Sequence, residues 1–296
     1  QKDNLKPSPV EGLLDLRKAI SERVKRINDI DVDPETGVVV TNGGQEAIML
    51  MVLASIGAIG DEMIVPEPNY STYNDAIEFA GGNKVGIPTL LEKDFAVDPD
   101  LVEQAVSDRS EALLLVSPNN PTASVIPTDT MQTLVNIAER HDLIVLADDI
   151  YDQFIYDGGV HCSPQSLEAG KNRTLTLNAF SKAYAMTGWR IGYGVWPGNL
   201  VDIVTRLNIN SVSCTNAATQ FAAIEALEGP QDSVEVMRQA FDERRSLIVE
   251  ETNTIPGFNS IVPKGAFYSM PNITGTGLSS KKMEGVLLEK LGIAAV

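Results

Sequence analysis

Short apolar runs alternate with amphipathic segments along the chain, and this alternation restricts the fold more than any other feature. Runs that favour β-strands occupy residues 62–65, 113–116, 143–146, 174–177 and 191–195. Helical spacing marks residues 13–27, 45–58, 128–141, 200–210, 216–227 and 233–252. Strand and helix in this order are typical of α/β proteins with a mostly parallel sheet. We therefore predict a three-layer α/β/α domain.

The two ends of the chain suggest a second, smaller domain. We predict a large domain over residues 30–250 and a smaller α+β domain made from residues 1–29 and 251–296. Residues 258–296 have the pattern of a strand, a glycine-rich turn, a helix and the start of another strand. Because that last apolar run stops at Val296, we expect the smaller domain to be incomplete at its C-terminal end.

The charge and the cysteine content argue against several classes of protein. The formal net charge is −17, and a surface this acidic repels phosphate backbones and anionic membranes. No run approaches the roughly 20 apolar residues that a membrane span needs. The two cysteines, Cys162 and Cys214, make no disulfide framework and fit a reducing cytoplasm. With only His141 and His161 and no CxxC motif, we expect no metal site.

Polar side chains follow three of the predicted strands, at the point where each strand ends. The strands are followed by an amide, by a carboxylate with a phenol, and by an amine: Asn120; Asp148 and Tyr151; Lys182. Ligands of open α/β sheets bind beyond the carboxyl ends of the strands, so these groups are expected to converge. Each has a structural alternative, since residues 119–121 are a turn signal and Asp148 suits a helix N-cap. Their shared position favours a binding site.

Five segments of the chain carry a combined signature: residues 41–47, 117–122, 148–151, 181–193 and 263–268. In their order and content they closely resemble the class I and II aminotransferases, which are fold-type I pyridoxal-phosphate enzymes. The resemblance implies that pyridoxal 5'-phosphate is the cofactor and that the chain exchanges amino groups between L-amino acids and 2-oxo acids. It also implies a homodimer with each active site near the subunit interface. The segment around Lys182 is closest in style to prokaryotic aspartate or broad-specificity enzymes.

The resemblance also implies roles for the residues at the strand ends. Lys182 carries the cofactor and moves a proton to or from the substrate α-carbon. Asp148 pairs with the pyridine nitrogen and keeps it protonated. Tyr151 and Asn120 hydrogen-bond the ring hydroxyl oxygen, and Asn120 is also the candidate for substrate binding. Tyr70 stacks on the ring, although plain packing is an equal alternative for this residue in the absence of the resemblance.

The cofactor phosphate needs cations and amide groups. Gly43, Gly44 and Gln45 lie at the start of a predicted helix, where N–H groups and the helix dipole favour an anion. Glycine allows the backbone to approach closely. Arg190, eight residues after Lys182, matches the phosphate arginine of the family, and its forked guanidinium suits that task. A surface ion pair is the alternative for Arg190.

The chain departs from the family pattern at several positions. Ala179 replaces the serine or threonine that helps to bind phosphate, which removes one hydrogen bond. Pro7 aligns with a tyrosine that reaches the phosphate of the partner subunit, so that contact is in doubt. Ala123 replaces a glycine in the turn after residues 120–122. The arginine that binds the substrate carboxylate in the family lies in a strand beyond Val296.

Two other functions remain open at this point. A pyridoxal-phosphate C–S β-lyase shares the cofactor residues, so the motifs do not exclude it; its products, pyruvate and ammonia, would identify it. A non-catalytic aminotransferase-like domain of a transcription regulator would carry a basic DNA-binding module before this region. No such module precedes Gly12 in this sequence, and the net charge has the wrong sign.

Overall fold

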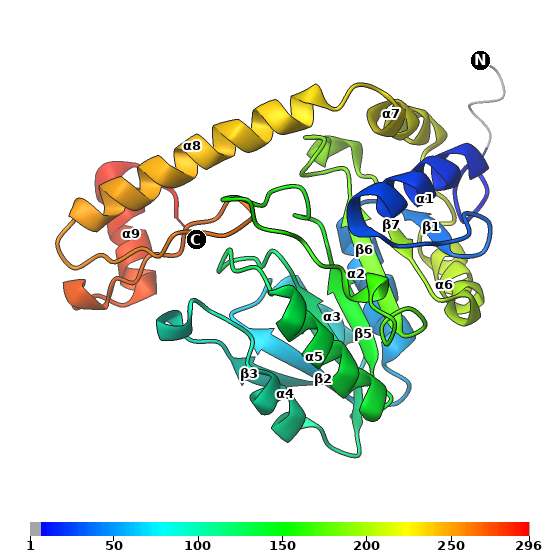
Figure 1. Cartoon of the computed structure of the whole chain (residues 1–296), viewed down its shortest axis with the longest axis horizontal. Helices are drawn as coiled ribbons and strands as arrows, with labels where there is room; N and C mark the ends of the chain where they lie inside the picture. Colours follow the sequence, from blue (N-terminus) through cyan, green and yellow to red (C-terminus); the bar gives the residue numbers. More distant parts are fainter. Residues whose placement is uncertain (1–6, 296) are drawn as a thin grey trace.

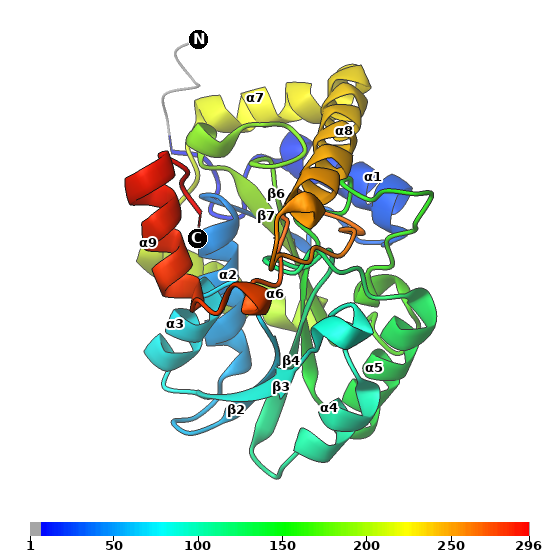
Figure 2. The same ribbon diagram turned by 90° about the vertical axis from the view of Figure 1, so that its left-hand side faces the viewer.

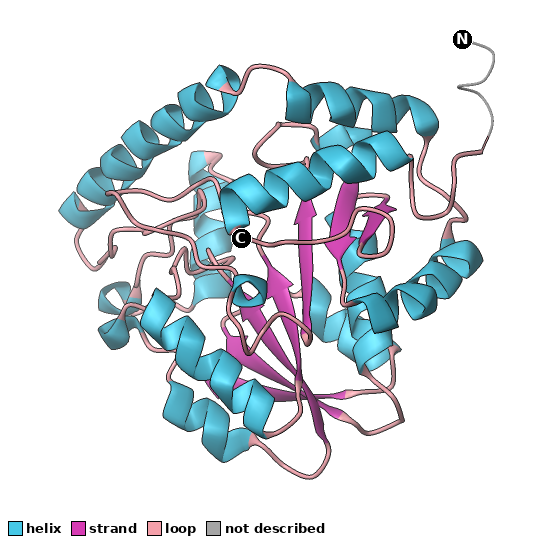
Figure 3. Ribbon diagram, turned by 45° about the vertical axis from the view of Figure 1, so that its right-hand side comes forward, coloured by secondary structure: helices cyan, strands magenta, loops and turns pink. Residues whose placement is uncertain are grey.

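In a computed structural model of the chain, which describes residues 7–295, the central feature is a mixed sheet of seven strands. The strands are β1 (Val38–Thr41), β2 (Glu62–Glu67), β3 (Asn83–Pro88), β4 (Ser110–Val116), β5 (Ile144–Asp148), β6 (Thr174–Ala179) and β7 (Gly192–Val195). Their order across the sheet is β1-β7-β6-β5-β4-β2-β3. Figure 3 shows the strands in magenta, with helices around them. Only β7 runs antiparallel to its neighbours β1 and β6. The prediction of a mostly parallel sheet is confirmed.

Helices cover both faces of this sheet (Figure 2). One face carries α2 (Gly44–Ser55), α3 (Thr72–Phe79) and α6 (Gly198–Ser211), and the other carries α4 (Pro99–Ala105) and α5 (Thr128–Arg140). Alternate residues of a strand point to opposite faces. In β4, Leu114 therefore packs in the core with α2, while Leu113 and Leu115 pack in the core with α5. This is the predicted three-layer α/β/α arrangement.

Helix α1 (Leu14–Asn28) packs on the sheet, beside β1, β7 and α7 (Ala217–Glu228) (Figure 1). Leu16, Ile20 and Val24 are buried in one cluster with Val38 and Val40 of β1. Helix α1 therefore contacts the sheet, whereas the sequence pattern grouped residues 1–29 with residues 251–296; residues 1–6 lie outside the described part. The physical reason is that the apolar face of α1 is buried against β1, the strand that follows it in the chain.

The C-terminal part of the chain leaves the sheet, and its residues 264–266 then contact the loops after β4 and β5. Helix α8 (Asp232–Thr254) leads from α7 toward α9 (Ser280–Leu291) (Figure 1). Between these helices the chain forms isolated β-bridges, at Ile155–Gly265 and at Asn259–Asn272, where a strand was predicted. Residues 293–295 also form no strand. Strands need a neighbour for their backbone groups, and the exposed Ile293 has none among the described residues.

Within residues 7–295, no group of three or more His, Cys, Asp or Glu side chains is placed to hold a metal ion. No helix in this part of the chain combines the length and the apolar character that crossing a membrane requires. Cys162 and Cys214 are both free thiols.

Candidate active site

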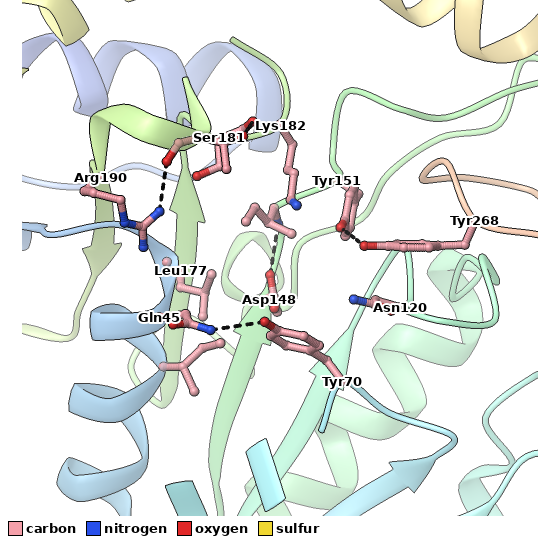
Figure 4. Close-up of a pocket in the computed structure, with 14 residues that line it drawn as sticks. Gln45, Tyr70, Asn120, Asp148, Tyr151, Leu177, Ser181, Lys182, Arg190 and Tyr268 are labelled. Carbon is pink, nitrogen blue, oxygen red and sulfur yellow. Dashed lines mark hydrogen bonds between the residues drawn. The ribbon is translucent and has the colours of Figure 1, made fainter. Parts of the chain in front are cut away.

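The carboxyl ends of β4, β5 and β6, which are neighbours in the sheet, border one cavity of about 450 Å³ (Figure 4). Most of the side chains that the sequence predicted for the site line this cavity: Gly44, Gln45, Tyr70, Asn120, Asp148, Tyr151, Lys182 and Arg190. The remaining one, Gly43, packs directly against the guanidinium of Arg190. The structure therefore brings the predicted residues together at the edge of the sheet where ligands of α/β folds bind.

Asp148 is the last residue of β5 and is only 5% exposed. Its Oδ2 accepts a hydrogen bond of 2.8 Å from the Tyr73 hydroxyl, and its Oδ1 accepts one of 3.1 Å from the backbone N–H of Ile150. Burial raises the pKa of Asp148 to about 6, although both hydrogen bonds and the charge of Lys182 oppose that rise. The helix-cap alternative is wrong, because residues 150–153 form a turn and no helix.

Lys182 lies in the turn that follows β6, with its side chain directed into the cavity (Figure 4). Its Nζ is 5.7 Å from the ring centroid of Tyr151 and 5.4 Å from that of Phe267. The faces of aromatic rings attract a cation at such distances. The amine therefore stands against an aromatic wall, on the same cavity as the Asp148 carboxylate.

An anion cradle is formed by the start of α2 and by Arg190. Gly43, at the helix N-cap, has φ of +83°, and a Cβ there would lie 2.6 Å from Nη2 of Arg190. The positive φ and the close approach of Arg190 both require glycine at position 43. Arg190 donates a 3.0 Å hydrogen bond to the carbonyl of Thr187. A guanidinium beside the N–H groups of a helix N-terminus is a suitable site for a phosphate.

The aromatic and amide residues occupy the sides of the cavity. The Tyr70 hydroxyl accepts a 3.2 Å hydrogen bond from Nε2 of Gln45, which links Tyr70 to the start of α2 (Figure 4). The Tyr151 hydroxyl is hydrogen-bonded to the Tyr268 hydroxyl. Burial raises the pKa of both Tyr151 and Tyr268, so both phenols keep their protons at neutral pH. Asn120 borders the same space from the loop after β4.

Sequence reasoning missed the hydrogen-bond partners of two site residues. Tyr73 had no predicted role, and its bond to Asp148 spans 75 positions of the chain. Tyr268 lies in the motif at residues 263–268 and had no predicted role of its own, although it lines the cavity. No local sequence signal indicates either contact, because both partners come from distant segments of the chain.

A buried polar cluster lies behind the cavity, where α1 meets the ends of β5 and β6. Arg23 of α1 forms a 2.9 Å ion pair with Asp152 and donates to Asn28, and both ionic side chains are almost fully buried. Asp152 also accepts hydrogen bonds of 3.0 Å from the amides of Asn28 and Asn178. Burying a charge pair requires such partners. The cluster attaches α1 to the loop that carries Tyr151.

His161 contacts a carboxylate and lies in no metal cluster of the described residues. Its Nε2 is 3.3 Å from Oδ2 of Asp149, and both side chains are buried. Burial is the largest single influence and lowers the pKa of His161, but the polar contact with Asp149 and the charges of Asp149 and Asp152 together outweigh it, so the net shift of the pKa is upward. His161 therefore belongs to the polar groups behind the cavity rather than to its lining.

Two departures from the family pattern have clear positions in the structure. Ala123 adopts φ of +58°, the left-handed region that glycine prefers, and its carbonyl accepts hydrogen bonds from the N–H groups of Lys264 and Gly265. The turn is therefore kept with alanine. Pro7 is exposed and does not line the cavity.

The donor set fits pyridoxal phosphate. At one side of the cavity, Arg190 and the start of α2 suit the phosphate, and Asp148 supplies a carboxylate for the ring nitrogen. The amine of Lys182 and the phenol of Tyr151 border the space between them (Figure 4). The glycine at position 43, where a Cβ would meet the guanidinium, is the local feature that most directly supports this fit.

Comparison with known proteins agrees with this geometry. The sequence pattern of the family described as "Aminotransferase class I and II" matches residues 1–296. An aromatic-amino-acid aminotransferase 2 from Thermococcus litoralis is 37% identical over 98% of this chain and 74% of its own length. An aspartate aminotransferase from Pyrococcus abyssi is 37% identical over 97% of this chain and 74% of its own length.

Solved structures give the same result. A crystal structure of an aromatic aminotransferase from Pyrococcus horikoshii superposes with a TM-score of 0.96 and 36% identity, and covers 100% of this chain and 79% of the other. A mutant of Thermus thermophilus aspartate aminotransferase superposes with a TM-score of 0.94 and 34% identity, and covers 100% of this chain and 80% of the other.

Proposed function

The chain belongs to the class I and II aminotransferases, a family that uses pyridoxal 5'-phosphate, and we propose that the cavity above β4, β5 and β6 is where it transfers amino groups. The substrates are an L-amino acid and a 2-oxo acid, with aspartate or a broad range of amino acids as donors. One observation carries the proposal. The amine of Lys182, the carboxylate of Asp148, the phenol of Tyr151 and the amide of Asn120 border a single cavity.

Each of these residues has a task that its chemistry allows. When bound, the cofactor supplies an electron-withdrawing ring that stabilises negative charge at the substrate α-carbon. Asp148 holds the proton on the ring nitrogen, because a buried carboxylate is a strong partner for a cationic N–H. Lys182 would hold the cofactor through its side-chain amine, and the same amine would move a proton at the substrate α-carbon. Tyr151 donates a hydrogen bond to the ring hydroxyl oxygen.

Other residues bind the cofactor and fix its orientation. Gly43, Gly44 and Gln45 offer the N–H groups at the start of α2 to the phosphate, and Arg190 offers its guanidinium. Tyr70 covers one face of the ring. Asn120 hydrogen-bonds the ring oxygen and the incoming substrate.

We expect the donor range to extend beyond aspartate. Relatives of this chain include enzymes named for aspartate and for aromatic amino acids.

We also propose that the protein is a cytoplasmic homodimer. The homodimer follows from the family resemblance, and the free thiols of Cys162 and Cys214 suit a reducing compartment. Light scattering coupled to size exclusion, together with cell fractionation, tests these two proposals. We further propose that residues 30–250 form the large domain, now with α1, and that the smaller domain begins at about residue 251, within α8. Limited proteolysis that releases a stable fragment beginning near residue 251 would support this division.

Reductive trapping tests the central proposal. Borohydride treatment of the yellow holoenzyme, followed by peptide mapping, is expected to find the cofactor on Lys182. Lys182→Ala should lose transamination and still bind free cofactor. Lys171→Ala is the matched control, because Lys171 is exposed and pairs only with Glu168 at the surface. Label on a different lysine would contradict the assignment.

Product analysis separates the two enzyme functions. A transaminase forms glutamate from 2-oxoglutarate when it is given an amino donor. A C–S β-lyase instead forms pyruvate and ammonia from a cysteine thioether. If the second pair of products appears without the first, the proposed reaction is wrong although the cofactor assignment stands.

A further inference from the structure

We propose that Tyr268 is a positioning residue that acts on the bound cofactor through Tyr151. This inference rests on the proposed function, in which Tyr151 donates a hydrogen bond to the cofactor ring oxygen. The two tyrosine hydroxyls are hydrogen-bonded to each other, and both side chains line the cavity (Figure 4). Their rings pack edge to face, with centroids 5.6 Å apart and planes at 82°.

The direction of the hydrogen bond between the Tyr151 and Tyr268 hydroxyls follows from the single proton that each hydroxyl carries. A phenol has one proton to donate and two lone pairs to accept. If Tyr151 donates its proton to the cofactor oxygen, it has none left for Tyr268. The proton between the two hydroxyls must then belong to Tyr268. Tyr268 therefore donates to Tyr151, and Tyr151 donates to the cofactor.

This chain of donors has two physical effects. It fixes the rotation of the Tyr151 hydroxyl, because the lone pair that accepts from Tyr268 determines where the proton points. It also polarises the Tyr151 hydroxyl and makes it a stronger donor, since hydrogen bonds in series reinforce one another in a low-dielectric site. Tyr151 is only 3% exposed, so water competes little for this bond.

The backbone around Tyr268 is attached to the loops that carry the other site residues. The N–H groups of Lys264 and Gly265 donate to the carbonyl of Ala123, over 3.1 and 3.0 Å. The N–H of Ala266 donates to the carbonyl of Phe154 over 2.8 Å. The position of Tyr268 is therefore set by the loop that contains Asn120 and by the loop that contains Tyr151.

Close packing strengthens this attachment. A Cβ on Gly265 would lie 2.5 Å from Cγ of Pro118, so only glycine allows the approach. The Tyr156 hydroxyl donates a 2.5 Å hydrogen bond to the carbonyl of Ala266. With its backbone held on both sides, Tyr268 presents its hydroxyl to Tyr151 at low entropic cost.

The test compares holoenzymes with one hydroxyl removed at a time. Tyr268→Phe, Tyr151→Phe and the double variant keep every ring and lose only hydroxyl oxygens. Tyr184→Phe is the matched control, because the Tyr184 hydroxyl bonds Gln231 outside the cavity. The readouts are the pH midpoint of the visible absorption of the bound cofactor, and the Kd of pyridoxal phosphate for the apoprotein.

Tyr268→Phe is expected to raise the pH midpoint by about 0.5 to 1 unit, the equivalent of one hydrogen bond. A weaker Tyr151 donor leaves more negative charge on the ring oxygen, and this charge favours the protonated chromophore. Tyr151→Phe should shift the midpoint further in the same direction. In the Tyr151→Phe background, Tyr268→Phe should cause no additional shift, and the control should match the wild type.

Two results would overturn the inference. One is an unchanged midpoint in Tyr268→Phe with an unchanged Kd for the cofactor. The other is an equal shift from Tyr268→Phe in both backgrounds, which would mean that Tyr268 acts independently of Tyr151. Failure of the proposed function gives a different result from failure of this inference. If the proposed function is wrong, the wild type itself shows no chromophore on Lys182.

Discussion

The Tyr73 hydroxyl donates a 2.8 Å hydrogen bond to Oδ2 of Asp148, so the acid at the end of β5 is held by helix α3. Both side chains are buried, and the second oxygen of Asp148 is held by the Ile150 N–H. A carboxylate with both oxygens engaged keeps one orientation. In this site that orientation is established before any ligand binds.

The raised pKa of Asp148 predicts how the stability of the apoprotein depends on pH. The Asp148 carboxyl has a pKa of about 6 when folded and its ordinary pKa of 3.8 when unfolded, so between these pH values the folded state binds more protons. Stability should therefore fall as pH rises from about 4 to about 6, by about 3 kcal/mol for this group. The Asp148→Asn variant should not show this loss of stability, because its side chain does not titrate.

Urea unfolding at pH 4.5 and pH 7.5 measures the free energy of unfolding of both proteins. Subtracting the value of the variant from that of the wild type removes the contribution of all other titrating groups, which the two proteins share. The variant should gain stability relative to the wild type at the higher pH. If both proteins lose the same free energy between the two pH values, burial does not raise the pKa of Asp148.

Gly43→Ala is expected to weaken cofactor binding by about tenfold or more, since the new Cβ would collide with Nη2 of Arg190 and force an unfavourable φ. Gly198→Ala is the control, because a Cβ at Gly198 meets nothing within 4 Å. Equilibrium titration of the apoprotein with pyridoxal phosphate measures both. Equal affinities in the two variants would show that the contact with Arg190 is unimportant.

Arg23→Ala should destabilise the fold by about 3 to 5 kcal/mol, because it leaves the buried Asp152 without its charge partner. Lys25→Ala, on the same helix, removes two exposed ion pairs, with Asp29 and with Asp31, and should cost less than about 1 kcal/mol. Denaturant unfolding of both variants provides the comparison. Similar small losses would indicate that α1 is held by its apolar face alone.

Ala179→Ser is expected to tighten cofactor binding by roughly fivefold, the effect of one hydrogen bond of about 1 kcal/mol. The Ala179 methyl faces Gly44, since a Cβ on Gly44 would lie 3.6 Å from it, so a hydroxyl here would face the anion cradle. Ala218→Ser, on the exposed surface of α7, is the control. Unchanged or weaker binding in Ala179→Ser would argue against a phosphate at this position.

The sequence predicted most elements that have a clear apolar pattern, but it missed β1, whose Val38, Val39 and Val40 form such a run. β4, β5 and β6 have such runs, because both their faces are buried. β3 lies at the sheet edge with Asn83 and Lys84 exposed, so it carries no apolar run. Helices α3 and α4 have 8 and 7 residues, too few for a distinct period.

The site was predictable where it depends on strand ends and less so where it depends on packing. Lys182, Asp148 and Asn120 follow strands that are neighbours in the sheet, so their convergence follows from topology. Hydroxyl partners such as Tyr73 and Tyr268 come from segments 75 and 117 positions away from the residues they contact. Their roles depend on how a short helix and a returning loop pack.

The hydrogen bonds that connect residues 264–266 with the loops after β4 and β5 are made largely by main-chain N–H and C=O groups. Every amino acid except proline carries both of these groups. Homologous sequences can therefore diverge at Ala123 or Lys264 without separating the two segments, whereas Gly265 and Pro118 should change only together.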